Sequence, residues 1–341
     1  MKIIVTANIV PFLPGGADYH VTGVTEQLRA NGHEVELLRF PFKFSPLPDI
    51  HRMMEFSENT DLNTLNGVSV DKVISLQFPT YGVQHNDHRV WVMHQHRAVY
   101  ELYEKDQPDP ELNRLQKKVI EFDNRHLALA KKLFANSERV AQRLKEFNDI
   151  ESQALYHPPY GSDQFYCDDS LDYFFCPSRL EELKRQDLII RAAQHIKSPV
   201  QLILGGEGGQ RNFYEKLIEQ LGVGHRVQLI GRFTEAEKIV FYARALGVIF
   251  VPQDEDYGYI TLEAMLASKP VITCVDSGGP TEFIKDESSG LLVEPDEYQL
   301  AEAIDRLYQN KQLAQKMGKQ GLQTYQEKNI SWSNVIESLL N

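Results

Sequence analysis

Two glutamates, Glu255 and Glu263, stand eight positions apart in the stretch EDYGYITLE. The apolar run at 248–251 predicts a strand before them, and residues 264–267 continue a predicted helix after them. Glu255 is therefore expected in the connecting loop and Glu263 in the early turns of the helix. A strand tip that enters a helix N-terminus attracts phosphorylated ligands, because unpaired backbone N–H groups and the helix dipole both favour anions. A carboxylate fits beside a phosphate where it accepts hydrogen bonds from neutral hydroxyls, such as those of a sugar and a ribose. The stretch therefore predicts a nucleotide-sugar site.

Two cations, Arg179 and Lys184, follow a strand predicted at 173–177. Their spacing allows both side chains to reach one diphosphate, the guanidinium as a bidentate fork and the ammonium as a mobile point charge. Transfer of a glycosyl group from a nucleoside diphosphate requires stabilisation of the negative charge on the departing group. Taken alone, such a pair is more often two solvated charges in a loop, so the hypothesis depends on the glutamates as well.

Strand-like apolar runs alternate with amphipathic segments along the chain, which is typical of parallel sheets covered by helices. In the first half, helices are expected near 21–30 and 111–131, and strands at 3–7, 35–40, 73–76, 90–93 and 133–135. The pattern restarts after a Pro- and Gly-containing segment at 156–163, which predicts an interdomain linker. Strands of a second sheet are expected at 173–176, 200–204, 227–230, 248–251, 271–274 and 291–293. The predicted fold class is α/β.

Two further segments complete this prediction. Residues 41–65 are rich in Pro, Met and Asn and show no regular pattern, so an irregular loop is expected there. Such a loop either contacts an acceptor or is an ordinary surface excursion. The tail, from Ser331 through Val335, Ile336 and Leu339, predicts a final helix with a serine N-cap.

The composition limits the class of protein. A length of 341 residues suggests two domains, and a net charge of −12, spread over both halves, argues against nucleic-acid binding. Three cysteines, Cys167, Cys176 and Cys274, are odd in number and lack metal-type spacing, which favours a reducing compartment. No apolar stretch approaches the roughly 20 residues of a membrane span. The expected location is cytoplasmic, with at most peripheral contact at the inner face of the cell membrane.

The spacing Glu-x-(Phe/Tyr)-Gly-x4-Glu at 255–263 resembles the signature of retaining glycosyltransferases of family 4. The resemblance covers nearly the whole C-terminal half, through SRL at 178–180 with Lys184, SGGPTE at 277–282 and GLLV at 290–293. In the N-terminal half, GGA at 15–17 and FANS at 134–137 are similar to the same family. The segment from FP at 78–79 to HQHR at 94–97 resembles a bacterial subgroup associated with surface polysaccharides.

This resemblance implies the GT-B architecture, in which two Rossmann-like doubly wound parallel-sheet domains face a cleft. It implies an acceptor-binding domain at 1–165 and a nucleotide-sugar-binding domain at 166–325. A C-terminal helix within 326–341 is expected to cross back and pack on the first domain.

The same resemblance implies roles for individual residues. Catalytic roles are expected for His94, Arg179, Lys184 and Glu255. Donor-binding roles are expected for Gly15, Gly16, Arg179, Lys184, Gly231, Phe233, Glu235, Glu255, Tyr257, Gly258, Tyr259 and Glu263. Candidates on the acceptor side are His96, Arg97 and Tyr100, and His94 ranks before His96 as the histidine that faces the donor sugar.

No metal and no cofactor are expected, because in the family the matching Arg and Lys stabilise the diphosphate in place of a metal. The run Asp254-Glu255-Asp256 could also be read as the Asp-x-Asp metal motif of the other large glycosyltransferase architecture. That alternative is disfavoured, since Arg179 and Lys184 already supply positive charge.

The implied function is a retaining, metal-independent transfer of a hexose-type sugar in glycan biosynthesis. The expected partners are a UDP- or GDP-sugar donor and a saccharide or lipid-linked saccharide acceptor. Donors such as UDP-glucose, UDP-N-acetylglucosamine and GDP-mannose stay open. Two alternatives stay open as well, namely a nucleotide-sugar epimerase of the same architecture and a non-catalytic subunit that binds a nucleotide sugar.

Overall fold

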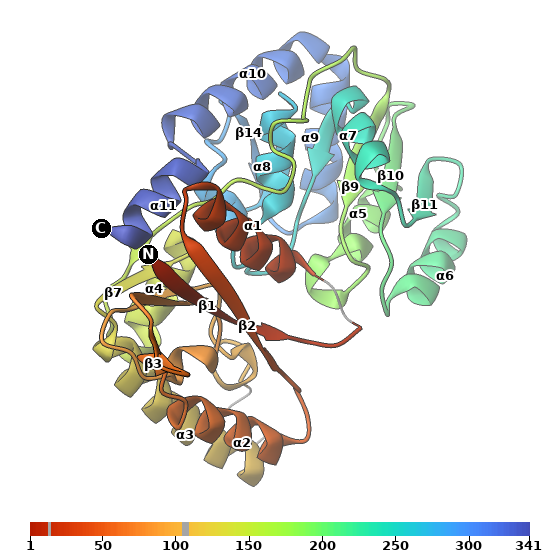
Figure 1. Ribbon diagram of the computed structural model, residues 1–341. Helices are drawn as coiled ribbons and strands as arrows, with labels where there is room; N and C mark the ends of the chain where they lie inside the picture. Colours follow the sequence, from red (N-terminus) through yellow and green to blue (C-terminus); the bar gives the residue numbers. More distant parts are fainter. Residues whose placement is uncertain (13–14, 104–108) are drawn as a thin grey trace. The chain divides into compact units, whose positions relative to one another are not determined.

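The computed structural model describes residues 1–12, 15–103 and 109–341, which divide into two compact units (Figure 1). Unit 1 comprises Met1–His157 together with Ser331–Asn341, and unit 2 comprises Pro158–Ile330. Each unit contains a six-stranded sheet whose neighbouring strands pair in parallel. The predicted α/β class with two Rossmann-like parallel sheets is confirmed.

The sheet of unit 1 has the strand order β2-β1-β5-β6-β7-β8. Its strands are β1 (Lys2–Ile9), β2 (Glu34–Pro41), β5 (Lys72–Ser75), β6 (His88–Val92), β7 (Lys132–Ala135) and β8 (Gln153–Ala154). Val5 of β1 lies opposite Leu37 of β2 and Ile74 of β5. Inner strands of a parallel sheet are covered on both faces, which explains the unbroken runs of buried residues in β1, β5 and β6. A separate antiparallel hairpin joins β3 (Thr64–Leu65) to β4 (Val68–Ser69).

The helices of unit 1 are α1 (Gly16–Ala30), α2 (Leu47–Glu58), α3 (Pro110–Leu129), α4 (Glu138–Asn148) and α11 (Trp332–Leu340), with short 3₁₀ turns η1 (Thr80–Gly82) and η2 (Arg97–Val99). Helix α1 begins five residues before the predicted start at position 21. Side-chain caps set other starts, because a cap satisfies an orphan backbone N–H. Asp109 accepts from the N–H of Glu111 at 2.8 Å, and Ser137 accepts from that of Val140 at 3.1 Å.

The prediction of an irregular loop at 41–65 is wrong, because this segment contains the 12-residue helix α2. Pro48 lies in its first turn, where the missing N–H costs no helical hydrogen bond. Ile50, Met54 and Ser57 form its buried face at helical spacing. The prolines that suggested a loop instead mark the start of a helix.

Helix α11 packs against α1 in unit 1. The hydroxyl of Ser331 accepts a hydrogen bond from the N–H of Asn334 at 3.2 Å, so the predicted serine cap is confirmed. Trp332 lies so close to α1 that a Cβ added at Gly23 would stand 2.3 Å from the indole ring. Val335 and Leu339 are buried in the same cluster as the strands β1 and β5.

The sheet of unit 2 has the order β11-β10-β9-β12-β13-β14, in which the chain order reverses between β9 and β12. Its strands are β9 (Tyr173–Pro177), β10 (Gln201–Gly205), β11 (Val227–Gly231), β12 (Gly247–Ile249), β13 (Val271–Cys274) and β14 (Gly290–Val293). Its helices are α5 (Gln186–Ala192), α6 (Arg211–Leu221), α7 (Glu235–Arg244), α8 (Tyr259–Leu266), α9 (Glu297–Gln309) and α10 (Lys311–Glu327), with 3₁₀ turns η3 (Glu182–Lys184) and η4 (Gly279–Glu282).

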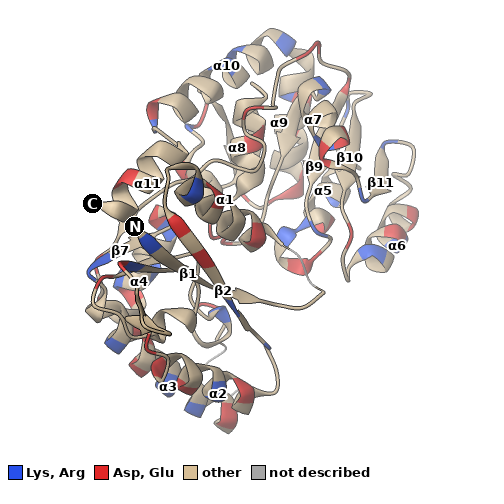
Figure 2. Cartoon of the chain, in the orientation of Figure 1, with Lys and Arg blue, Asp and Glu red and all other residues tan. Residues whose placement is uncertain are grey.

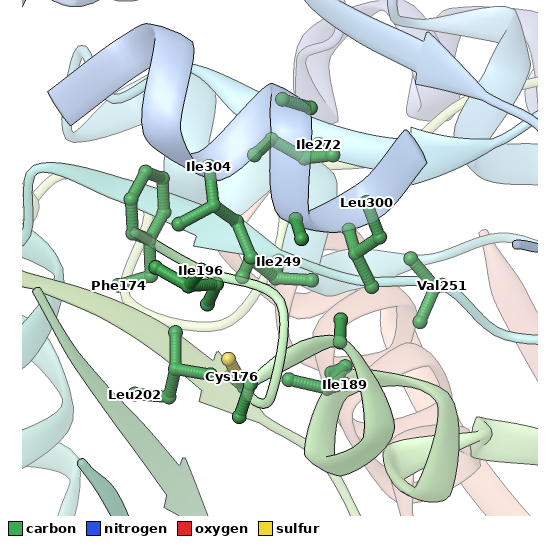
Figure 3. Close-up of a cluster of buried hydrophobic side chains, with 14 of the residues drawn as sticks. Phe174, Cys176, Ile189, Ile196, Leu202, Ile249, Val251, Ile272, Leu300 and Ile304 are labelled. Atoms are coloured by element: carbon green, nitrogen blue, oxygen red, sulfur yellow. The ribbon is translucent and has the colours of Figure 1, made fainter. Parts of the chain in front are cut away.

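Alternate residues of β9 point to opposite faces of this sheet. Phe174 and Cys176 pack with α5 and α9, and Figure 3 shows them beside Ile189, Ile249 and Ile304. Tyr173 and Phe175 belong to the second cluster, which includes residues of α7 and α8. Both faces are therefore apolar, and polar chemistry is left to the strand ends.

Charged residues of both signs are interspersed on the surface, as Figure 2 shows on α2, α3 and α6. Such mixing is unlike the one-sided basic face of a nucleic-acid-binding domain. Among the described helices, none is both long and apolar enough to cross a bilayer.

Within the described part of unit 1, four histidines are buried: His20, His88, His96 and His157. Burial lowers the pKa of His157 to about 3 and the pKa values of His88 and His96 to about 4. Burial also lowers the pKa of His20 well below its ordinary value. The rings of His20 and His157 stack with centroids 4.2 Å apart, and Trp91 meets His20 edge-on at 4.0 Å.

Unit 1 should lose stability as the pH falls from about 7 to about 5. The fold keeps these imidazoles neutral, whereas the unfolded chain protonates them near pH ~6.5, so the unfolded state binds more protons below that value. Each histidine then lowers the free energy of unfolding by up to about 1.4 kcal/mol per pH unit. Urea unfolding followed by tryptophan fluorescence measures this effect, because both tryptophans of the chain, Trp91 and Trp332, lie in unit 1.

A His157→Gln variant should make the free energy of unfolding depend less steeply on pH. The decrease should correspond to about one bound proton. The variant His33→Gln, at a half-buried position of the same unit, is the matched control for replacement of a histidine by glutamine. An equal free energy of unfolding at both pH values would contradict the prediction.

Candidate active site

The candidate site of unit 2 lies where the strand order reverses. Phe175 of β9 pairs with Val248 of β12, yet the connections from these two strands continue toward opposite edges of the sheet. Loops that diverge at such a reversal leave room for a ligand at the carboxyl ends of the strands. Arg179 and Lys184 follow β9, and Glu255 follows β12. The structure therefore brings Lys184 and Glu255 into contact and places Arg179 on the same loop as Lys184.

The backbone around Arg179 packs directly on the glycine-rich stretch after β10. A Cβ added at Gly206 would stand 2.0 Å from the carbonyl oxygen of Ser178, and one at Gly208 would stand 2.3 Å from that of Leu180. Any side chain there would displace the loop that carries Arg179. These glycines therefore position the cation by allowing close approach of two backbones.

Lys184 donates to the carboxylate of Glu255, and the two side chains are 18% and 21% exposed. Arg179 is exposed, and its guanidinium has no ion-pair or hydrogen-bond partner within the described parts of the chain. An incoming anion would thus meet Arg179 directly and compete with Glu255 for Lys184.

The loop that carries Glu255 is held against the loop after β13. Glu255 forms a parallel bridge with Gly278, and its carbonyl oxygen accepts from the N–H of Gly279 at 2.8 Å. A Cβ at Gly278, where φ is +70°, would stand 2.5 Å from that same oxygen. Gly258, with φ +83°, turns the chain into α8. The two glycines are required by backbone conformation and by close approach.

Tyr257 is buried, and its ring centroid lies 5.1 Å from that of Tyr259 and 5.9 Å from that of Phe283. Tyr259 is half-buried and begins α8. The side chain of Tyr257 therefore supports the loop by packing, while its backbone adjoins Gly258.

Glu263 lies in the second turn of α8 and is buried. Its two oxygens accept from the ammonium of Lys238 at 2.8 Å and from the hydroxyl of Tyr242 at 2.7 Å. Lys238 also pairs with Glu235 at 2.7 Å. Although burial opposes it, the charges of Glu263 and Glu235 raise the pKa of Lys238 above its ordinary value. Each oxygen of Glu263 keeps a lone pair that can accept a further hydroxyl.

The other predicted donor contacts lie at the end of β11 and the start of α7. The carbonyl oxygen of Gly231, where φ is +71°, accepts from the N–H of Gly206 at 2.8 Å. The ring of Phe233 packs against Phe175, with centroids 5.8 Å apart. Glu235 is exposed in the first turn of α7. Through Lys238, Glu235 is linked to Glu263.

In unit 1, the predicted glycine pair lies at the start of α1. Gly15 is the N-cap and Gly16 is the first helical residue, and both are exposed. The N–H of Gly15 donates to the carboxylate of Asp18 at 3.0 Å. Asp18 also pairs with Arg39 at 2.5 Å, so this helix start already has a local anionic partner.

The predicted residues after β6 differ sharply in exposure. His94 is half-buried, and its Nδ1 lies 2.8 Å from the carbonyl oxygen of Gln95. His96 is buried and stacks on Phe78 with centroids 5.4 Å apart. Arg97 is half-buried and pairs with Glu101 at 2.5 Å. His94 is therefore the more accessible histidine.

Tyr100 belongs to a buried polar network that the sequence did not reveal. Its hydroxyl donates to Asp123 at 2.7 Å, and the hydroxyl of Tyr81 donates to the other carboxylate oxygen at 2.6 Å. Burial raises the pKa of Asp123 to about 7, although the hydroxyl donors oppose this shift. One feature of the sequence indicates this network, because Asp123 falls between Val119 and Leu127 on the apolar face of α3. The network ties the loops after β5 and β6 to α3 through hydrogen bonds, and the acceptor-side role of Tyr100 stays a prediction.

Within the described residues, no group of three or more His, Cys, Asp or Glu side chains could hold a metal ion. In the run Asp254-Glu255-Asp256, the carboxylate of Glu255 is engaged by Lys184.

Comparison with known proteins bears on unit 2 most directly. Residues 167–324 match the model of the family described as Glycosyl transferases group 1. The matched segment lies within unit 2. It contains every predicted donor-binding residue except Gly15 and Gly16.

Curated relatives match in part. The chain is 34% identical over 114 residues to alpha-1,3/1,6-mannosyltransferase ALG2 of Homo sapiens, which covers 33% of this chain and 27% of that protein. It is 30% identical over 168 residues to poly(ribitol-phosphate) alpha-N-acetylglucosaminyltransferase of Staphylococcus aureus, which covers 48% of this chain and 34% of that protein. The chain thus spans less than half the length of these two relatives.

Solved structures match over the whole chain at low identity, which establishes the fold alone. Sucrose-phosphate synthase from Thermosynechococcus elongatus has a TM-score of 0.79 at 19% identity and covers 100% of this chain and 98% of its own. Anabaena HepE in complex with UDP and glucose has a TM-score of 0.71 at 16% identity, with 99% of both chains covered. This likeness over the whole chain agrees with the predicted α/β fold of two parallel-sheet domains.

Removal of the Lys238 ammonium, which links the carboxylates of Glu235 and Glu263, should destabilise unit 2. Lys238→Met leaves Glu263 buried without a counter-charge, and the free energy of unfolding of unit 2 should fall by about 3 kcal/mol. Differential scanning calorimetry measures this change. The double variant Lys238→Met/Glu263→Leu should recover most of the loss, because no buried charge then remains.

Glu235→Gln is the matched control. The variant changes the Glu235 side chain, which is 46% exposed, and leaves the buried partner Glu263 in place. Its effect should stay below about 1 kcal/mol. If Lys238→Met and Glu235→Gln lowered the free energy of unfolding equally, the buried Lys238–Glu263 pair would contribute nothing to stability.

Proposed function

We propose that the chain is a retaining, metal-independent glycosyltransferase that transfers a hexose-type sugar from a UDP- or GDP-sugar. The acceptor is a saccharide or a lipid-linked saccharide, and the reaction belongs to glycan biosynthesis. The observation that carries the proposal is the placement of Arg179, Lys184 and Glu255 at the strand reversal of a glycosyl transferases group 1 segment. Glu263 follows on the helix that starts from the same loop.

Each charge at this site has a part in the proposed reaction. Arg179 and Lys184 stabilise the negative charge that develops on the departing diphosphate. Lys184 then exchanges Glu255 for a phosphate oxygen, which frees that carboxylate to accept hydrogen bonds from the hydroxyls of the donor sugar. Glu263, already oriented by Lys238 and Tyr242, accepts the ribose hydroxyls. In this proposal, side-chain cations stabilise the charge that a divalent ion stabilises in other enzymes.

The chemistry in this proposal needs no side chain as a general base. In front-side displacement the bond from the anomeric carbon to the phosphate oxygen breaks while the acceptor oxygen bonds to the same face. The acceptor proton passes to the departing phosphate oxygen. Retention of configuration follows, and NMR of the product anomeric proton tests it, because an inverted product would refute this step.

The names of similar proteins support a nucleotide sugar as donor. HepE is described in complex with UDP and glucose, and one curated relative is named a mannosyltransferase and another an N-acetylglucosaminyltransferase. This range favours a UDP- or GDP-linked hexose. We assign the donor to unit 2 and the acceptor to unit 1.

Binding should be detected first, with a panel of UDP-, GDP-, ADP- and TDP-sugars. A donor that binds only the folded state should raise the apparent melting temperature, and calorimetry should give its affinity. Slow hydrolysis of that donor without acceptor should fall by at least about a hundredfold in Glu255→Ala. Binding without any hydrolysis would identify a non-catalytic subunit, and conversion of the bound sugar to its epimer would identify an epimerase.

Transfer should also persist after treatment with excess EDTA, since Arg179 and Lys184 supply the positive charge. Initial rates before and after chelation, with the same acceptor, measure this. Complete loss of activity that manganese restores would show that the Asp254-Glu255-Asp256 run binds a metal after all.

A further inference from the structure

Arg185 has a backbone conformation that does not suit its residue type. It follows Lys184 directly and lies in the left-handed region, with φ +51° and ψ +40°. Residues with a Cβ are disfavoured there, and glycine is the usual occupant. Its side chain is nevertheless only 16% exposed. A long cation at such a position requires compensating contacts.

The guanidinium of Arg185 makes those contacts with two other loops. Its Nε donates to the carbonyl oxygen of Val251 at 2.7 Å, and its Nη2 donates to that of Pro252 at 2.7 Å. Its Nη1 and Nη2 also donate to the two carboxylate oxygens of Asp276, at 2.8 and 2.7 Å. One planar group therefore joins the loops that follow β9, β12 and β13.

These contacts lie at both ends of the Lys184–Glu255 pair. Arg185 is the chain neighbour of Lys184, and Val251 and Pro252 lead into the loop that carries Glu255. Asp276 precedes the glycines on which the backbone of Glu255 packs. The Lys184–Glu255 pair itself cannot fix the loops, because Lys184 must change partners when a diphosphate binds.

We infer that Arg185 is a positioning residue, which holds the three loops of the donor site in place while Lys184 exchanges Glu255 for the diphosphate. Its consequence for catalysis rests on the proposed function, whereas its effect on the loops does not. Val251 and Pro252 are buried at the end of a strand, so their carbonyl oxygens need a donor. The bidentate geometry with Asp276 then fixes the direction of the guanidinium.

The decisive variant is Arg185→Gly, because glycine adopts this backbone conformation without strain and the variant should fold. Hydrogen exchange followed by mass spectrometry should show faster exchange at the backbone N–H groups of 253–255 and Gly279, which bond across the loops. Exchange in the strands β9, β10 and β13 should be unchanged. This measurement requires no donor and no activity.

The kinetic readout separates positioning from simple loss of stability. At a temperature well below the melting transition, kcat of Arg185→Gly should fall by about ten- to a hundredfold, while KM for the donor changes by less than about threefold. Added guanidinium ion at millimolar concentration should restore part of kcat, with sodium chloride of equal ionic strength as the control. Arg185→Lys should stay impaired, because an ammonium cannot form the bidentate pair.

Arg306→Ala is the matched control, since it removes another bidentate Arg–carboxylate pair, with Glu287, from the same unit. It should change neither loop exchange nor kcat. Unchanged loop exchange in Arg185→Gly would overturn the inference, whether or not the chain is a transferase. Faster loop exchange with a normal kcat would overturn the catalytic part alone. Failure of the wild-type chain to bind any nucleotide sugar would refute the proposed function, and loop exchange would still decide the role of Arg185.

Discussion

The reversal of strand order between β9 and β12 is the constraint on which the site of unit 2 depends. Two adjacent parallel strands send their connections toward opposite edges of the sheet, so their loops part at the carboxyl ends. Everything polar in the site is then carried by loops and helix starts, since both faces of the sheet are apolar. Glycines let these loops touch backbone to backbone, as Gly206 does at Ser178 and Gly278 does at Glu255.

Charge is arranged around this reversal in pairs with different exposure. Lys238 and Glu263 are buried and hold each other in one orientation, which suits groups that should not move during a reaction. Lys184 and Glu255 are more exposed and can separate in favour of a ligand. Arg179 is exposed, and in the proposed function it is the first contact for an anion. The site thus combines a fixed part with a part that changes partners.

The sequence was informative where the signal is local and less so where it depends on contacts between distant segments. Strand runs and the serine cap at Ser331 follow from periodicity and capping, and both were predictable. Helix α2 was missed because its prolines were read as breakers. Arg185 could not be found from the sequence, because its partners lie about 66 and 91 positions away and only the folded sheet brings them together. The network around Asp123 was predictable from the sequence, since a carboxylate on an apolar helix face needs buried hydrogen-bond donors.

The inclusion of α11 in unit 1 has a consequence for the order of events on the ribosome. The first 157 residues emerge early, but their cluster around α1 lacks Val335 and Leu339 until the last part of the chain is made. Unit 2 is continuous from Pro158 to Ile330, so its packing needs no segment from outside that range. Unit 1 begins to be synthesised earlier but is completed later, and the side of α1 that contacts Trp332 stays uncovered until α11 is made.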